Sequence, residues 1–228
     1  MRTLPNGWVE ARRKLHRWET KVIIAGVEYD EANIFGLTTS AALYSSGTVA
    51  IGGCVSKEID LTILPKGNIP RMAEIVVWVR PVSAEVNTDW LQKGVFYIDT
   101  RETDKASGLM TLHGYDAMLK AEQTFLTETT EDDWPKPMDE VVAEIAQRMG
   151  VTVDRRTVVS HTLKAGYPLE YTMREVLGYI ASAHAGNWII TDAGELRLVG
   201  LADIPAETFY LVTEDGDAIL FGDTKILI

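Results

Sequence analysis

The first half of the chain carries the hydrophobic pattern of β-strands. Ile59, Leu61 and Ile63 alternate with polar residues, which places them on one face of a strand. The run at 75–79 is continuous and β-branched, as is typical of a strand that is covered on both faces, and Pro70 and Pro81 flank it. Strands are predicted over residues 21–27, 55–64, 75–79, 94–100 and 109–113. Several strands joined by polar turns, with little helix, favour an antiparallel barrel or sandwich.

The hydrophobic period changes after residue 116. Asp116 is placed to cap a short helix at 117–122. Pro137 suits the first turn of a longer helix, and Gly150 suits its C-cap. The apolar face of that helix recurs at helical spacing through Met138, Val141, Val142, Ile145 and Met149.

A second helix and a hairpin complete this α+β region. Thr172 and Glu175 have the spacing of a capping box, and Gly186 is expected to stop the helix that follows. Segments 188–191 and 196–199 then form a predicted hairpin around the turn at 192–194. The remaining residues hold short apolar runs and Asp-Gly turns, which indicate the start of a further β unit. The predicted domains are therefore 1–115, 116–200 and 201–228.

Charge is unevenly distributed along the 228 residues, whose formal net charge is −11. Residues 1–120 contain 14 basic and 14 acidic side chains, whereas residues 121–228 contain 8 and 19. Binding to a phosphate backbone requires clustered Lys and Arg, so the composition argues against nucleic-acid recognition. The single cysteine excludes a disulfide framework and a Cys-rich zinc site. The absence of a long apolar run predicts a soluble, intracellular protein without membrane insertion.

Candidate chemistry is sparse. Cys54 and His113 are the components of a nucleophile pair, but nothing in the sequence brings them together, and a buried Cys and a strand His are the preferred interpretation. His161 with Asp154 is a possible acid/base pair, for which solvated loop positions are preferred. The acidic run 131–133 is interpreted as a solvated loop rather than a cation site. We therefore predict no catalytic, cofactor-binding or metal-binding residues, and no cofactor.

Basic and aromatic residues near the start suggest a contact surface. Arg12, Arg13, Lys14, His16 and Arg17 are interleaved with tryptophans at positions 8 and 18. The run is short, so we interpret it as an arm that docks on a neighbouring acidic subunit rather than on nucleic acid. Three further tryptophans are candidate interface residues: Trp78, Trp90 and Trp188. Core packing is the preferred interpretation for Trp188, whereas core packing and an interface role are weighted equally for Trp90.

The order of segments resembles a known family. A β region ends at Leu109–His113 and runs through the junction Tyr115-Asp116-Ala117-Met118, and the helix Thr172–Ala181 with its Arg-Glu-Val-Leu core follows the 141–150 helix. This order is similar to the N-terminal part of phage tail hub proteins. Those are the baseplate hubs of contractile tails and the tail-associated proteins of long-tailed phages and prophages of Gram-positive bacteria. The likeness is best over residues 50–200.

The resemblance implies a structural role. Hubs of this family form homotrimers in which each subunit gives two β-barrel tube domains to a pseudo-sixfold ring. Residues 1–115 would be the first tube domain, 116–200 the inserted α+β domain and 201–228 the beginning of the second, possibly truncated. The implied partners are further copies of the chain, the tail tube protein, the tail-tip spike and other baseplate proteins. DNA would only pass through the lumen, and the protein would reside in the virion tail, assembled in the bacterial host.

Two other classes stay open at this point. One is a tail-tip cell-wall hydrolase or peptidase, which peptidoglycan clearing by the protein, compared with its Cys54→Ala and His113→Ala variants, would reveal. The other is a carbohydrate- or receptor-binding module, because an exposed tryptophan such as Trp90 can stack on a sugar. The absence of a catalytic set favours the structural role, and the chain is expected not to be an enzyme.

Overall fold

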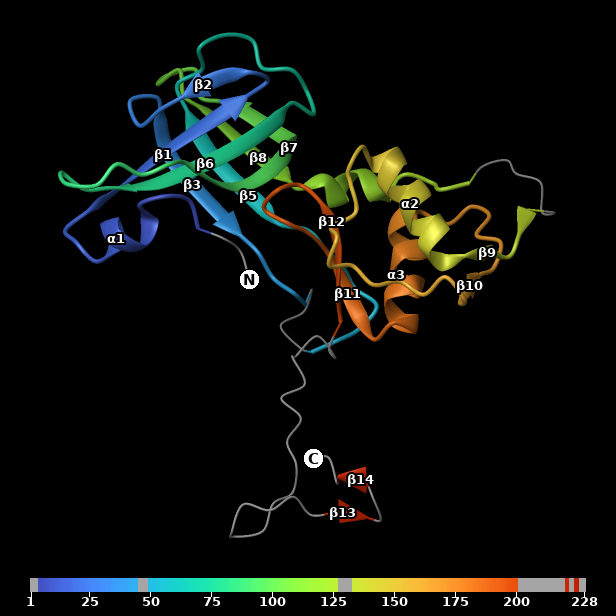
Figure 1. Cartoon of the computed structure of the whole chain (residues 1–228). Helices are drawn as coiled ribbons and strands as arrows, with labels where there is room; N and C mark the ends of the chain where they lie inside the picture. The colour runs from blue at the N-terminus through green and yellow to red at the C-terminus, as the bar shows by residue number, and fades with distance from the viewer. Residues whose placement is uncertain (1–3, 45–48, 127–132, 201–219, 222–223, 226–228) are drawn as a thin grey trace.

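Two packed units make up the computed structural model, which describes residues 4–44, 49–126, 133–200, 220–221 and 224–225. One unit is a curled antiparallel sheet, and the other is a small sheet covered by helices (Figure 1). Each unit has its own cluster of buried apolar side chains. The chain is thus an α+β protein, as its hydrophobic pattern predicts.

The large sheet has seven strands in the order β2-β1-β6-β7-β8-β5-β3, and every neighbouring pair is antiparallel. The strands are β1 (Arg17–Ile24), β2 (Val27–Tyr29), β3 (Ile34–Ser40), β5 (Glu58–Ile63), β6 (Glu74–Val82), β7 (Leu91–Thr103) and β8 (Met110–Tyr115).

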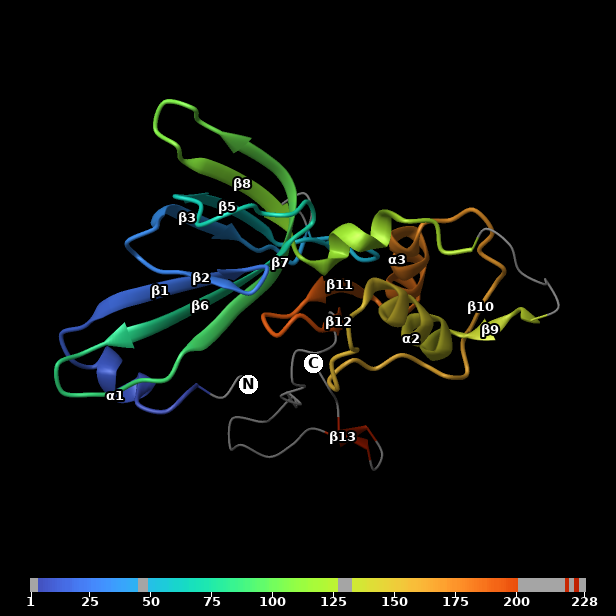
Figure 2. The same ribbon diagram turned by 90° about the horizontal axis from the view of Figure 1, so that it is seen from above.

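The sheet curls into a half-barrel around strand β7 (Figure 2). The first half of β7 pairs with β6 and the second half pairs with β8, with a register shift between Ile98 and Thr100. Such an irregularity bends the strand and increases its twist. The concave side holds a core that includes Ile24, Ile75 and Phe96, and burying each such side chain contributes about 1.5–3 kcal/mol.

Local structure departs from the sequence expectations in several places. The 21–27 run is a hairpin, because Ala25 and Gly26 adopt positive φ between β1 and β2. The 55–64 run is divided: β5 starts at Glu58, and β4 (Cys54–Val55) joins the other unit. Pro81 lies inside β6 opposite Trp18, beyond the residues of β6 that pair with β7. A short helix, α1 (Trp8–Arg12), precedes the sheet.

The second unit packs helices on one face of a three-stranded sheet of order β12-β11-β4. Its elements are the 3₁₀ helix η1 (Ala117–Glu122), β9 (Lys136–Pro137), α2 (Met138–Met149), β10 (Lys164–Ala165), α3 (Met173–Ala183), β11 (Gly186–Ile190) and β12 (Leu196–Gly200). β9 and β10 form a separate two-stranded ladder.

Three of the predicted helix ends are confirmed, and two differ. Pro137 is the N-cap of α2 rather than its first residue, and α3 ends at Ala183 with His184 as C-cap, before Gly186, which begins β11. The Asp116 side chain accepts a hydrogen bond from the Met118 N–H and caps η1. Gly150 is the left-handed C-cap of α2, at φ 70°. Thr172 and Glu175 form the reciprocal capping box at the start of α3. Local capping chemistry therefore sets the boundaries of these helices.

The region after residue 200 is described only in part. β13 (Leu220–Phe221) and β14 (Thr224–Lys225) form an antiparallel pair. Apart from these two strands, the third predicted domain, 201–228, lies outside the described residues, so its assignment remains a prediction.

Candidate interaction surfaces

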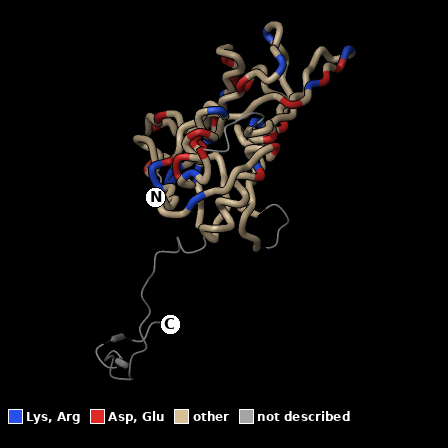
Figure 3. The backbone as a smooth tube through the Cα atoms, turned by 90° about the vertical axis from the view of Figure 1, so that its right-hand side faces the viewer, with Lys and Arg blue, Asp and Glu red and all other residues tan. Residues whose placement is uncertain are grey.

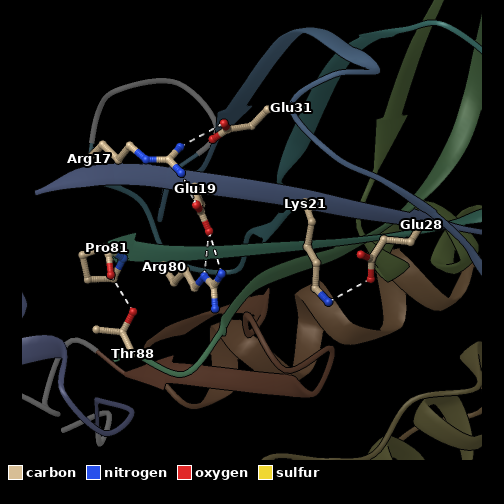
Figure 4. Close-up of polar contacts among 8 residues, drawn as sticks. All are labelled: Arg17, Glu19, Lys21, Glu28, Glu31, Arg80, Pro81 and Thr88. Atoms are coloured by element: carbon tan, nitrogen blue, oxygen red, sulfur yellow. Dashed lines mark hydrogen bonds and ion pairs between the residues drawn. The ribbon is translucent and has the colours of Figure 1, made fainter. Parts of the chain in front are cut away.

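Ion pairs cover one edge of the large sheet (Figure 4). β2 pairs only with the end of β1, from Val22 onward, so no strand of the described residues lies beside the earlier part of β1 on that side. Lys21 Nζ lies 2.9 Å from Glu28 Oε2, and Arg17 Nη1 lies 3.3 Å from Glu31 Oε2. Charged side chains along an edge disfavour the addition of another strand. This edge is therefore protected.

Trp90 lies against charged side chains near the same edge. The Arg80 guanidinium lies 4.5 Å and the Lys21 ammonium 4.9 Å from the centroid of a Trp90 ring. Glu19 holds Arg80 in place through an ion pair of 2.7 Å. Cation–π contacts of this kind stabilise a tryptophan by about 0.5–1 kcal/mol each at exposed sites. The half-buried indole is therefore engaged by its own chain.

The opposite edge, β3, lacks this protection. None of its seven residues is charged, and β5 is its one neighbour among the strands that the structure describes. Consecutive strand residues point to opposite faces, and Thr38, Thr39 and Ser40 are all exposed. Both faces of this end of β3 are therefore exposed in the described structure. The side chain of Phe35, at the register shift near the start of β3, is 61% exposed. An uncharged edge with unpaired backbone groups is suited to pairing with another strand.

Arg174 of α3 connects three segments at the joint between the units. Its guanidinium donates to the Cys54 carbonyl, to Ser56 Oγ at 3.1 Å and to the Met118 carbonyl at 3.2 Å. Its Nε lies 2.5 Å from Glu122 Oε1. A planar guanidinium with five donors can serve all of these acceptors at once. Arg174 therefore fixes α3 to β4 and η1.

Asp116 forms a second contact at the joint. Its carboxylate, 1% exposed, accepts from the Lys57 N–H at 2.9 Å and from the Met118 N–H at 3.0 Å. Burial raises its pKa to about 6, and hydrogen bonds from these N–H groups oppose that rise. The Lys57 ammonium in turn lies 2.5 Å from Asp192 at the tip of the β11–β12 hairpin. The two units are thus joined by buried polar contacts.

Gly52 allows the segment before β4 to approach α3 closely. It adopts φ 82°, and a Cβ there would lie 2.1 Å from Ser182 Oγ. Next to it, the Gly53 N–H donates to the buried Asn187 Oδ1 at 2.7 Å, and the Asn187 amide donates to the Ala50 carbonyl. Sequence reasoning did not find Asn187 or Arg174, because their partners lie more than 50 residues away.

Cys54 and His113 have separate partners. The Cys54 thiol donates to the Arg174 carbonyl, and burial raises its pKa to about 12. His113 Nδ1 lies 2.8 Å from Asp60 Oδ1 on the neighbouring strand β5. A thiol with so high a pKa is not a thiolate near neutral pH and is a poor nucleophile. The geometry supports the preferred interpretation of both residues as structural.

His161 and Asp154 do not form a pair. His161 Nδ1 lies 3.0 Å from Asp139 Oδ1, on α2, and its side chain is exposed. The expectation of a solvated Asp154 is wrong, because it is 3% exposed and forms a two-pronged ion pair with Arg156. That guanidinium lowers the pKa of Asp154 to about 2. In the acidic run 131–133, two of the three residues lie outside the described residues.

The basic segment near the start is part of the folded chain rather than a free arm. Trp8 is 4% exposed and its Nε1 donates to the Asp89 carbonyl at 2.7 Å. The Lys14 ammonium pairs with Glu85 at 2.5 Å. Trp188 is fully buried, with its Nε1 donating to the Leu177 carbonyl, which confirms its predicted core role.

Within the described ranges, no group of three or more His, Cys, Asp or Glu side chains is arranged to hold a metal ion. None of the helices described there combines the length and apolar character needed to cross a bilayer.

Two solved structures share this arrangement of sheet and helical unit. One is the prophage MuSo2 43 kDa tail protein from Shewanella oneidensis, with a TM-score of 0.55 and 13% identity over 92% of this chain. The other is the tail protein from Neisseria meningitidis MC58, with a TM-score of 0.56 and 12% identity over 86% of this chain. The matches cover 61% and 54% of those proteins, so the chain spans less than two thirds of their length.

No family model and no curated protein matches the chain. At 12–13% identity, the structural matches establish a shared fold. The fold is therefore one that these two tail proteins, one of them from a prophage, adopt.

Proposed function

We propose that the protein is a structural component of a phage or prophage tail. The observation that carries this proposal is the shared fold with two tail proteins over 92% and 86% of the chain. A structural role also fits the polar joint, where Arg174 and Asp116 fix the helical unit to the half-barrel.

Within the tail, we propose a hub that assembles as a homotrimeric ring between the tail tube and the tail tip. The uncharged β3 edge supports this assignment, because strand pairing between neighbours is a direct way to close a ring. The charged β1 edge limits the number of ways in which copies can associate. Partners at the two ends of the ring would be the tail tube protein and the tip or baseplate proteins.

The charge distribution suits a lumen that DNA crosses without binding. Lys and Arg are interspersed with Asp and Glu along the described backbone in the view of Figure 3. A wall that binds phosphate would retain the DNA through released counterions. The balanced first 120 residues, with 14 basic and 14 acidic side chains, support passage rather than retention.

The alternatives have weaker support. A hydrolase based on Cys54 and His113 requires a reactive thiol, whereas Cys54 is protonated and hydrogen-bonded to a helix carbonyl. A sugar-stacking role for Trp90 requires a free ring face, and two cations contact that indole. We therefore infer that the chain is not an enzyme.

Electron microscopy of the purified chain in negative stain tests the hub assignment. The proposal predicts ring-shaped particles with a central opening, formed by three subunits. A matched pair of variants sharpens the test: Thr38→Lys on the β3 edge abolishes the rings, whereas Thr111→Lys, on an exposed position of the central strand β8, leaves them intact. Particles without an opening, or rings that survive Thr38→Lys, contradict assembly through β3.

A further inference from the structure

A polar cleft of about 790 Å³ lies on the face of the small sheet that the helices do not cover. The β11–β12 hairpin contributes Ile189, Thr191 and Arg197, the loop 152–156 forms one wall, and Lys57 reaches in from the segment before β5. The loop is fixed to β12, since the Leu196 N–H donates to the Thr152 carbonyl at 2.8 Å. The cleft is therefore built on regular, hydrogen-bonded backbone.

Two of the four cations in the cleft are already paired. Lys57 Nζ lies 2.5 Å from Asp192 Oδ1, and Arg156 forms its two-pronged pair with Asp154. Besides these two aspartates, Glu195 is the one other acid in the lining. Four basic and three acidic side chains give the lining a formal charge of +1.

The other two cations are arginines without a hydrogen-bonding partner. Within the described part of the chain, Arg155 has no hydrogen bond or ion pair and is exposed. Arg197 Nε is shielded from solvent and donates to no acceptor there, although its charge favours the ionised form of the nearby Asp154. A buried donor without an acceptor is uncommon in folded proteins, so such a group is available to a bound water or ligand. Arg197 therefore offers a donor to a ligand that enters this cleft.

We propose that this cleft binds a carboxylate on a peptide segment of another protein, with Arg197 and Arg155 as its anion-binding residues. A guanidinium matches the two oxygens of a carboxylate geometrically. A lining with a charge of only +1 and three carboxylates favours a monoanion over a phosphate, which carries more charge. The volume exceeds what a small ion needs and falls in the range of ligand sites, and Ile189, Val153 and Ala193 provide apolar contact for flanking residues.

One chain supplies every residue of the lining, so binding can be tested on the full chain in any oligomeric state. The probe is the peptide acetyl-Val-Glu-Val-amide, and its matched control is acetyl-Val-Gln-Val-amide. Binding is followed by the NMR resonances of the arginine Nε–H groups. The proposal predicts that the Glu peptide shifts the Arg197 resonance in a saturable manner and that the Gln peptide does not.

Variants locate the site. Arg197→Gln weakens binding of the Glu peptide by about tenfold or more, because a charge-assisted hydrogen bond is lost. Arg155→Gln, at an exposed position, weakens it without affecting the fold, whereas Arg13→Gln on the surface next to α1 leaves it unchanged. The proposal is overturned by an equal response to the Gln peptide, by no response, by tighter binding of inorganic phosphate, or by full binding in both cleft variants.

Discussion

Replacing Arg174 by alanine tests whether the joint holds the two units together. The substitution removes three hydrogen bonds, to the Cys54 carbonyl, Ser56 and the Met118 carbonyl, and leaves the carbonyls without this donor. Hydrogen bonds to a charged group contribute about 1.5–3 kcal/mol each when the acceptor is buried. The Arg174 side chain is 27% exposed, so part of this energy is screened by solvent. We expect a loss of about 3 kcal/mol in the free energy of unfolding.

The assay is urea unfolding followed by tryptophan fluorescence and far-UV circular dichroism. In thermal unfolding, the same loss lowers the Tm of a chain of this length by roughly 6–12 °C. Arg174→Lys recovers about half of the loss, because an ammonium cannot span the same acceptors. As a control, Arg17→Ala removes exposed ion pairs and costs less than about 1 kcal/mol. The reasoning is refuted if Arg174→Ala is no more destabilising than Arg17→Ala.

Three further predictions concern Asp116, Cys54 and Thr38. The folded pKa of Asp116, about 6, exceeds its unfolded value near 4, so its contribution to stability is lost as pH rises through this range. The free energy of unfolding of Asp116→Asn, taken relative to wild type, therefore rises by up to about 3 kcal/mol from pH 4 to pH 7, as measured by calorimetry. A difference between variant and wild type that does not change with pH contradicts the assignment. Cys54 resists a thiol reagent at pH 8 until urea unfolds the chain, because burial raises its pKa to about 12; rapid labelling of the folded protein argues against this. Thr38→Lys retains the Tm of wild type within a few degrees while abolishing self-association in sedimentation velocity, and an unchanged sedimentation profile excludes β3 as the contact strand.

Local chemistry explains which parts of the fold could be predicted. The caps at Asp116, Gly150 and Thr172 involve residues within a few positions of one another, so their spacing is visible in the sequence. The alternation in β5 likewise reflects one buried face. These features depend on neighbours along the chain, and the structure confirms them.

Other features depend on contacts between distant segments. β3 was not predicted because a bulge near Gly36 interrupts its alternation and its residues are mostly exposed. β4 is two residues long and exists through its parallel pairing with β11, more than 130 residues later. Arg174 reads as an ordinary helix-surface arginine until Cys54 and Met118 lie beside it. Long-range pairing of this kind leaves no local signal.

The same limit applies to the candidate surfaces. The ion pairs Arg17–Glu31 and Lys21–Glu28 protect an edge against strand addition only because β1 and β2 lie at the end of the sheet. The order of segments in the sequence resembles that of tail hubs, and the fold shared with two tail proteins supports a role in a tail. The hub position, the trimer and the lumen remain proposals.

The absolute mass in solution, measured by light scattering over a concentration series, tests self-assembly most directly. We expect a species near three times the 25.3 kDa subunit mass, which persists on dilution into the low micromolar range. A species of 25.3 kDa at every concentration contradicts a self-assembling ring formed by this chain.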